Sequence, residues 1–470
     1  MHGRHGGWTG AIAGRARLAA ALAALALAGC AAPPARLVPS EDAATPMWLD
    51  AQGRPRTFAA YAEEARRRIA ARNTVVAAQR TPADREAMAA LVGPHEWPRA
   101  AGAGTDCTAE NTDALLLVHG LTDSAFLMRD LGDALARAPL APGRCTMARS
   151  LLLPGHGTVP GDLLRVRYET WLAATEWGVR SFAGKADRVH LVGFSTGGAL
   201  GMLAAYRQHP QPGAPALASL VLVSPALQPL DRRAQKPLVL RLLAASGLKS
   251  WLGEHDDGDF AKYESFALNG GAQVARLAQV LDREEGPFPL PVFIALSLDD
   301  HTVNSRVTVE RFLARSVDGS RLWLAAPGAA AHSDPLVRRA AADPRARVVD
   351  AAAAPDVRDI AHPALPVRPG NPHYGRGGDY VDCLAYDDDG LPPGDAWCAC
   401  LGARPARRPL PPACEGRPPD RAVVYGELPV PPAASAGPLL RRLTFNPLFD
   451  DMAAGMLAFL RRQAAEGVQP

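Results

Sequence analysis

A serine between two glycines, at the end of an apolar run, constrains the fold of this chain more than any other feature. The segment Gly193-Phe194-Ser195-Thr196-Gly197 directly follows the apolar run from Val189 to Val192, and a helical pattern from Ala199 to Gln208 comes next. In a strand–turn–helix of this kind the serine takes a strained backbone conformation that exposes its Oγ, and the glycines remove side chains that would clash with the neighbouring backbone. We therefore predict that Ser195 is a nucleophile at the carboxyl end of a buried strand.

Five further apolar runs predict the sheet in which this strand lies. The six expected strands cover Leu115 to Val118, Ser150 to Leu153, Val189 to Val192, Leu220 to Val223, Val292 to Leu296 and Arg321 to Ala325. Helical patterns separate them, which is typical of βαβ units and of a mainly parallel sheet. A chain of 470 residues has ample material for one such core with insertions. We predict an α/β fold.

The remaining sequence divides around this core. A helix is expected from Phe58 to Arg72, and another from Leu448 to Arg462 that docks on the sheet. The expected domain boundaries are a signal peptide at 1–29, a tether at 30–56, an N-terminal extension at 57–110, core segments at 111–335 and 441–463, a helical cap at 226–290 and a Cys/Pro/Gly-rich insertion at 336–440. Within the cap, helical patterns run from Leu238 to Leu248 and from Phe260 to Leu281.

The N-terminus has the pattern of an export signal. Arginines precede an apolar run of about eleven residues from Leu18 to Ala28, which is too short to span a bilayer of about 30 Å. Its end, Leu27-Ala28-Gly29-Cys30, resembles the lipobox of bacterial lipoproteins, which implies lipid attachment at Cys30. Ala31 follows, and by the same resemblance this favours the periplasmic face of the outer membrane. The alternative is an ordinary secretory peptide with a chance cysteine.

The cysteines fit an oxidising compartment. Of seven, removal of Cys30 leaves an even number, as disulfides require: Cys107, Cys145, Cys383, Cys398, Cys400 and Cys414. Cys107 and Cys145 bracket the first strand–helix unit and are candidates to pair, whereas the late four allow no unique connectivity. A zinc site at Cys398 and Cys400 is the rival interpretation, but their one-residue spacing disfavours it.

The charge gives no indication of a nucleic-acid partner. The formal net charge of +3 arises from basic and acidic residues spread along the chain, so no basic block predicts nucleic-acid binding. We expect neither a metal nor a cofactor. The pattern leaves the oligomeric state open.

A hydroxyl nucleophile requires a base, and the base requires an acid that fixes its tautomer. Asp300 lies about four residues after the strand from Val292 to Leu296, where such an acid is expected, and Asp299 is the alternative. Two histidines follow the last expected strand. We favour His362, whose apolar neighbours would orient an imidazole, and keep His332, which is closer to that strand, as the alternative base.

Backbone amides are expected to stabilise the oxyanion. His119-Gly120 ends the strand from Leu115 to Val118, so the N–H of Leu121 is expected to form half of the oxyanion hole. The N–H of Thr196 would supply the other half. We expect the side chain of His119 to be structural.

With these residues assembled, the chain resembles the monoacylglycerol lipase and carboxylesterase group of α/β hydrolases, in particular an exported bacterial branch. The resemblance spans most of residues 57–463. It is carried by the segments 119–124 (HGLTDS), 151–162 (LLLPGHGTVPGD), 191–199 (LVGFSTGGA) and 442–447 (RLTFNP). In that branch a Ser-His pair and a Pro-His-Tyr-Gly element supply the base, similar to Ile360–Leu365 and Pro372–Gly375 here. Ala361 replaces the serine, and His332 is kept for that reason.

The resemblance implies the α/β-hydrolase fold and hydrolysis of carboxylic esters by Ser195, His362 and Asp300 through an acyl-enzyme. An apolar cap would suit lipid-like or medium acyl esters. Its candidate lining residues, or core of the cap, are Leu238, Leu240, Leu242, Leu243, Phe260 and Phe266.

Other functions are possible on the same fold. A peptidase would need an anchor for a free amine, for which the acidic residues Glu254, Asp256, Asp257 and Asp259 are candidates, or else a solvated loop. A thioesterase and a non-catalytic envelope lipoprotein that binds a partner are further alternatives.

Overall fold

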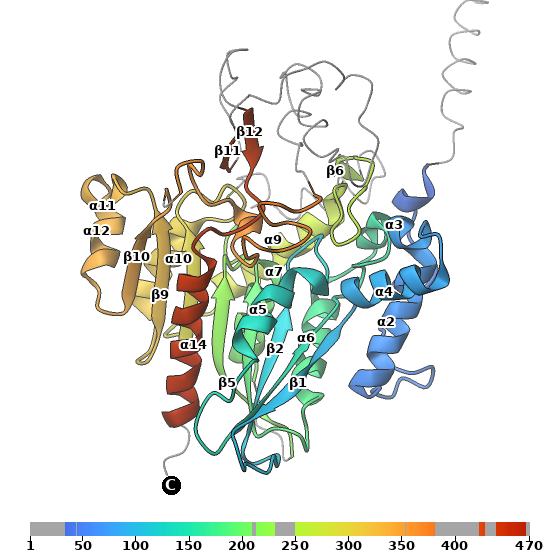
Figure 1. The fold of residues 1–470 in the computed structure, drawn as a ribbon, viewed down its shortest axis with the longest axis horizontal. Helices are drawn as coiled ribbons and strands as arrows, with labels where there is room; N and C mark the ends of the chain where they lie inside the picture. Colours follow the sequence, from blue (N-terminus) through green and yellow to red (C-terminus); the bar gives the residue numbers. More distant parts are fainter. Residues whose placement is uncertain are drawn as a thin grey trace, which may run out of the picture.

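The computed structural model describes residues 33–43, 45–208, 213–230, 250–352, 354–380, 423–427 and 439–466. An eight-stranded sheet forms its centre, in the order β1-β3-β2-β4-β5-β8-β9-β10 (Figure 1). Its strands are β1 (His95–Ala101), β2 (Thr112–Val118), β3 (Cys145–Ser150), β4 (Arg188–Phe194), β5 (Ala216–Val223), β8 (Val292–Ser297), β9 (Arg321–Ala326) and β10 (Ala346–Asp350). All neighbours pair in parallel except β1, which runs antiparallel to β3.

Alternation along the strands divides the core into two layers. In β2, Leu116 packs into the cluster on one face, whereas Leu115 and Leu117 pack into the cluster on the other. Helices α5 (Arg129–Leu135) and α14 (Phe449–Glu466) cover the second face and lie in front of the sheet in Figure 1. The first face is covered by α6 (Tyr168–Arg180), α7 (Thr196–Tyr206), α9 (Leu268–Asp282), α10 (Ser305–Arg315) and α12 (Pro335–Ala342).

The expected mainly parallel α/β sheet is confirmed, but it is larger than the sequence indicated. Five of the six expected strands fall inside observed ones, and β3 ends at Ser150, where the predicted strand begins. Two edge strands were missed. β1 lies in the expected N-terminal extension, and β10 lies beyond the boundary placed at residue 335, so the core continues into the expected insertion. Both have exposed positions, which removes the continuous apolar run that marks a central strand.

The segment expected to be a tether is packed against the protein from Pro33 onward. Leu37, Met47 and Trp48 are buried, and the 3₁₀ turn η1 (Ala35–Leu37) contacts η3 (Pro160–Leu164). The expectation of a free tether over 30–56 is therefore wrong for its described part. The prolines suggested an extended spacer, but the segment also contains large apolar side chains. Burying these side chains against the protein is favourable, so the segment packs rather than standing free.

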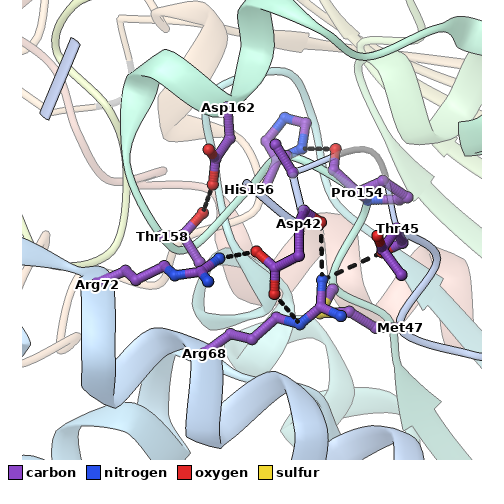
Figure 2. A pocket seen from close by; sticks show the side chains of 11 residues that line it. Asp42, Thr45, Met47, Arg68, Arg72, Pro154, His156, Thr158 and Asp162 are labelled. Atoms are coloured by element: carbon purple, nitrogen blue, oxygen red, sulfur yellow. Dashed lines mark hydrogen bonds and ion pairs between the residues drawn. The ribbon is translucent and has the colours of Figure 1, made fainter. Parts of the chain in front are cut away.

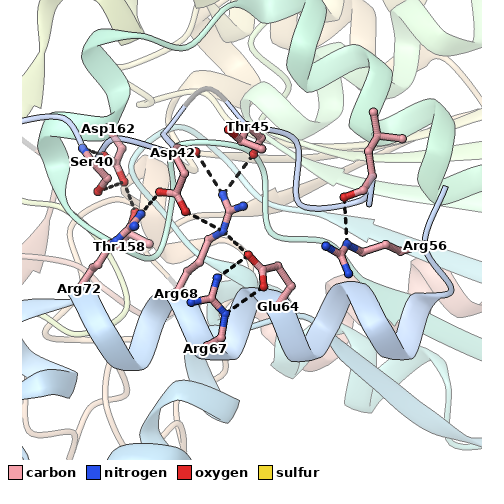
Figure 3. Close-up of polar contacts among 11 residues, drawn as sticks. Ser40, Asp42, Thr45, Arg56, Glu64, Arg67, Arg68, Arg72, Thr158 and Asp162 are labelled. Atoms are coloured by element: carbon pink, nitrogen blue, oxygen red, sulfur yellow. Dashed lines mark hydrogen bonds and ion pairs between the residues drawn. The ribbon is translucent and has the colours of Figure 1, made fainter. Parts of the chain in front are cut away.

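Polar contacts fix the same segment. Asp42 binds Arg68 and Arg72 of α2 (Phe58–Arg72), around a small pocket that His156 and Thr158 also line (Figure 2). Ser40 donates to Asp162 through its N–H at 2.6 Å and its Oγ at 3.1 Å (Figure 3). Helix α2 has the bounds expected from the sequence, and α3 (Thr74–Ala77) and α4 (Pro82–Val92) follow it.

In the region expected to be a helical cap, helix α9 begins at Leu268 and not at Phe260. Before it lie the short strands β6 (Trp251–Gly253) and β7 (Phe266–Ala267) and an irregular stretch in which Asp257 and Asp259 are buried. The expected helix from Leu238 to Leu248, with its lining leucines, lies outside the described residues.

The described part of the late insertion approaches the carboxyl ends of the strands. The 3₁₀ turn η4 (His362–Ala364) lies here, together with the parallel pair β11 (Val423–Gly426) and β12 (Leu439–Arg442). Cys107 and Cys145 form a disulfide with a Cα–Cα distance of 5.8 Å. The signal segment, Cys30 and the four late cysteines lie outside the described residues, among which no helix is long and apolar enough to cross a membrane.

Candidate active site

Ser195 occupies a sharp turn between β4 and α7. Its φ of 52° and ψ of −115° are a strained combination for a residue with a side chain. A Cβ at Gly197 would lie 2.1 Å from the carbonyl oxygen of Val118, and one at Gly193 would lie 2.5 Å from the oxygen of Gly197. Only glycine fits at either position, so the two glycines permit the turn that presents Ser195.

His362 and Asp300 meet Ser195 at this turn. The Nε2 atom of His362 lies 3.1 Å from the Oγ of Ser195, and its Nδ1 lies 2.6 Å from the Oδ2 of Asp300. All three residues are buried, with exposed fractions of 7% for Ser195, 6% for His362 and 4% for Asp300. The Ser195–His362 and His362–Asp300 contacts both lie within hydrogen-bond reach, as a nucleophile, its base and its acid would require.

Asp300 is held as a carboxylate. Burial alone would raise its pKa, but the His362 imidazole and the N–H groups of Val303 and Thr302 outweigh that effect and lower the pKa. Those amides donate to Oδ1 at 2.9 and 2.8 Å, so Oδ2 is left for His362. Asp299, the alternative acid, behaves differently: burial and the nearby charge of Asp359 raise its pKa to about 6.

The alternative base, His332, lies in α11 (Ala330–Ser333), after β9. Its side chain is outside the described part of the structure. His362 lies 62 residues from Asp300 along the chain, and only the folded chain brings the two together. The ring of Phe194 packs against His362 with a centroid distance of 5.0 Å and supports its orientation.

Of the two expected oxyanion amides, that of Thr196 directly follows Ser195 in the chain, and that of Leu121 lies in the loop after β2. Gly120 is so close to the serine that a Cβ there would lie 3.0 Å from the Cβ of Ser195. Among the described residues, neither the N–H of Leu121 nor that of Thr196 has a hydrogen-bond acceptor. Amide donors without a backbone partner are what an oxyanion hole requires, so both remain candidates for that role.

The side chain of His119 links the loop after β2 to Leu153. Its Nε2 accepts from the N–H of Leu153 at 3.0 Å, so Nδ1 carries the proton and donates to the carbonyl oxygen of Gly120 at 2.8 Å. Burial lowers the pKa of His119 well below its usual value, and the nearby His156 acts in the same direction. A neutral, doubly bonded ring fits the structural role expected for it.

Asp123 is a carboxyl group that sequence reasoning did not single out. Burial raises its pKa to about 7, although Lys262 and His362 act in the opposite direction. Its Oδ2 lies 2.7 Å from where a Cβ of Gly120 would be. The one available signal was an acidic residue in an otherwise apolar and small loop.

Two of the four acidic residues weighed as an amine anchor already have partners within the protein. Asp257 accepts from the Oγ of Ser265 at 2.6 Å, and Asp259 lies 3.0 Å from the Nε2 of His373. Glu254 and Asp256 are exposed. A buried, unpaired carboxylate for a substrate amine is thus not found at these positions. The described residues also contain no group of three or more His, Cys, Asp or Glu side chains arranged to hold a metal.

Comparisons with known proteins point to lipases and esterases. No family model matches the chain. It is 30% identical over 118 residues to a thermostable monoacylglycerol lipase of Bacillus sp. (strain H-257), a match that covers 24% of this chain and 43% of that lipase. The chain therefore spans less than half the length of this curated relative.

Three solved structures are similar to parts of the chain. One belongs to the metagenome-derived lipolytic enzymes LipS and LipT, at 19% identity over 49% of this chain and 86% of that one, with a TM-score of 0.37. The monoacylglycerol lipase of Paleococcus ferrophilus is 18% identical over 45% and 84%, with a TM-score of 0.35. A soluble variant of the monoglyceride lipase of Saccharomyces cerevisiae is 13% identical over 50% and 82%, with a TM-score of 0.37.

These TM-scores are low, so the fold assignment depends on the molecule's own topology. The strand order, the antiparallel first strand and the strained serine directly after β4 are together typical of the α/β-hydrolase fold. The chain has the α/β-hydrolase fold and is similar to the monoacylglycerol lipase and esterase group of that fold.

Proposed function

We propose that this protein hydrolyses carboxylic esters with Ser195 as nucleophile, His362 as general base and Asp300 as the acid that orients the base. The observation that carries the proposal is the continuous contact from the Oγ of Ser195 through both ring nitrogens of His362 to a buried carboxylate. The similarity to a monoacylglycerol lipase supports the same reaction class.

In the acylation step, the Oγ of Ser195 attacks the ester carbonyl while its proton passes to Nε2 of His362. The N–H groups of Leu121 and Thr196 stabilise the negative charge on the tetrahedral oxygen, which is worth several kcal/mol for such a pair of donors. His362 then returns the proton to the departing alcohol, and the acyl group remains on Ser195.

In the second step, water replaces the alcohol. His362 takes a proton from the water, whose oxygen attacks the acyl-enzyme, and the proton returns to the Oγ of Ser195 as the acid product leaves. Asp300 stabilises the imidazolium in both steps and keeps the Nδ1 proton in place. These steps need no metal or cofactor.

We propose lipid-like or medium acyl esters as substrates. The Bacillus relative is a monoacylglycerol lipase, which supports a glyceride-type ester. Apolar rings also lie next to the loop that carries Leu121: Phe126 packs edge-on against Phe260 at 5.3 Å between ring centroids. Internal pairing of Asp257 and Asp259 leaves these two carboxylates without a free valence for a substrate amine, which disfavours an aminopeptidase that would use them.

The test compares purified protein on aryl esters of increasing acyl length, aryl thioesters and aminoacyl amides, with Ser195→Ala as the control. We expect turnover of esters above that of amides, and covalent labelling of Ser195 by a fluorophosphonate that the variant lacks. Faster turnover of amides or thioesters would reassign the reaction. If the folded protein is not labelled, the binding-lipoprotein alternative replaces catalysis.

We also propose that a lipid at Cys30 anchors the protein to the periplasmic face of the outer membrane. The lipobox-like sequence before Cys30 supports this proposal. Palmitate labelling in a bacterial host, followed by membrane fractionation, tests it. Labelling that persists in Cys30→Ala would contradict the anchor site.

A further inference from the structure

The backbone N–H of His362 needs a partner that its own turn does not provide. His362 is the first residue of η4, and the N-cap residue, Ala361, offers no side-chain acceptor. The first N–H groups of a helical turn have no partner within it, and a buried donor without an acceptor is costly. Because η4 has three residues and includes Pro363, its internal hydrogen bonds hold His362 only weakly.

Glu427, distant in sequence, supplies the acceptor. Its Oε2 accepts from the N–H of His362 at 2.9 Å, and the residue is 2% exposed. Its other oxygen, Oε1, accepts from Nε of Arg442 at 3.0 Å. Both carboxylate oxygens are therefore engaged, and Arg442 compensates the negative charge.

The backbone of Glu427 is fixed as well. Its N–H donates to Asp359, and its carbonyl oxygen accepts from Arg358 at 2.7 Å. Just before it, Tyr425 exchanges two backbone hydrogen bonds of 2.8 Å with residues 356 and 358. The segment before Glu427 thus pairs with the segment that leads into His362. On its other edge, the same segment, β11, pairs with β12.

We propose that Glu427 is a positioning residue for His362, in an inference that rests on the proposed role of His362 as general base. Asp300 sets the tilt of the imidazole through Nδ1, whereas Glu427 sets the position of the backbone from which the ring projects. Together they hold Nε2 within reach of Ser195. The turn η4 and Glu427, which lies far along the chain in the late insertion, thus both help to place His362 beside Ser195.

The experiment uses the full chain with three substitutions, Glu427→Ala, Glu427→Asp and Glu427→Gln, and with Glu310→Ala on the exposed face of α10 as the control. It measures kcat and KM on a short-chain aryl ester and the hydrogen-exchange rate of the His362 amide. Alanine removes the acceptor, aspartate keeps the charge but shortens its reach, and glutamine keeps an acceptor oxygen without the charge.

We expect Glu427→Ala and Glu427→Asp to lower kcat by about 10- to 100-fold, the loss typical of a misplaced catalytic group, with KM unchanged. Exchange of the His362 amide should accelerate in both. Glu427→Gln keeps an acceptor for the N–H of His362 but turns its NH₂ group toward Nε of Arg442, so amide protection should largely persist and kcat should fall less than in Glu427→Ala. Glu310→Ala should match wild type. If Glu427→Ala does not fold, the aspartate variant gives the same test.

Wild-type kcat and amide protection in a folded aspartate or alanine variant would overturn the inference. So would a glutamine variant with full protection and the kcat of the alanine variant, because the charge and not the position would then matter. A third outcome separates the two proposals. If the wild type turns over no ester but the His362 amide still exchanges faster in the Glu427 variants, the proposed function is rejected, whereas the contact between Glu427 and His362 is established.

Discussion

Asp300→Asn tests the base–acid pair directly, because the structure fixes how an amide would sit there. The N–H groups of Thr302 and Val303 donate to Oδ1 at 2.8 and 2.9 Å, so the amide oxygen must occupy that position. The NH₂ group then faces Nδ1 of His362, 2.6 Å from the present carboxylate oxygen. An NH₂ group can only donate, so Nδ1 becomes the acceptor and the ring proton moves to Nε2.

The displaced proton blocks catalysis. Nε2 is the atom that faces the Oγ of Ser195 at 3.1 Å, and once protonated it cannot accept the serine proton. We expect kcat to fall by about 10³- to 10⁴-fold, which corresponds to about 4 to 5.5 kcal/mol of activation free energy. KM should change little, since substrate contacts are intact. Steady-state kinetics on a short-chain aryl ester, with a thermal melt to verify folding, measure both quantities.

Asp299→Asn is the matched control. In the described structure its Oδ2 is buried without a hydrogen-bond partner, and the raised pKa of about 6 means that ionisation of Asp299 opposes folding. That cost begins above the unfolded-state pKa near 4 and is complete above about 6. We expect wild-type kcat and a higher Tm at pH 8, with the gain vanishing near pH 4. Loss of kcat in Asp299→Asn together with wild-type kcat in Asp300→Asn would refute the assignment of Asp300 as the acid.

Three further predictions test the surroundings of the site. Gly197→Ala should abolish fluorophosphonate labelling and destabilise the fold by about 1 to 3 kcal/mol or more, since its methyl group would meet the carbonyl oxygen of Val118; Gly370→Ala, with open space around it, should behave as wild type in both assays. Burial disfavours the charged form of His373, but two aspartates bonded to its ring outweigh this and raise its pKa to about 9. The resulting stability is complete below about pH 6.5 and lost as pH rises through 9, so the Tm should fall over that window in wild type and not in His373→Gln; equal slopes would contradict the pairing. Replacing both Cys107 and Cys145 by Ser should lower the free energy of unfolding by about 4 kcal/mol in a urea titration, from the chain entropy of a loop with a sequence separation of 38, and an unchanged midpoint would contradict that contribution.

The local pattern determined the central strands and the turn at Ser195. Uninterrupted apolar runs mark strands buried on both faces, so β2, β4, β5, β8 and β9 were found where they were expected. The glycines around Ser195 were equally readable, because the backbone clashes that exclude larger residues lie within a few residues or at the adjacent strand end. Edge strands such as β1 and β10 lack this pattern, since one side of each faces solvent.

Long-range contacts were beyond local reasoning. The prolines before residue 57 suggested a spacer, but the burial of Leu37, Met47 and Trp48 depends on surfaces contributed by distant segments. The acidic residues Asp257 and Asp259 suggested a solvated or ligand-binding loop, whereas inside the protein Asp257 forms an ion pair with Arg36 and Asp259 one with His373. A residue's charge is visible in the sequence, but its partner is set by the fold.

The sequence by itself determined the class of fold and the turn that carries Ser195, and it predicted the order of nucleophile, acid and base along the chain, because strand periodicity and turn chemistry are local properties. Only the tertiary structure decided which histidine meets Asp300 and what holds that histidine in place. The Asp300–His362 and Glu427–His362 contacts join residues separated by 62 and 65 positions. Such contacts form only when separate segments pack together, and no local pattern encodes that distance.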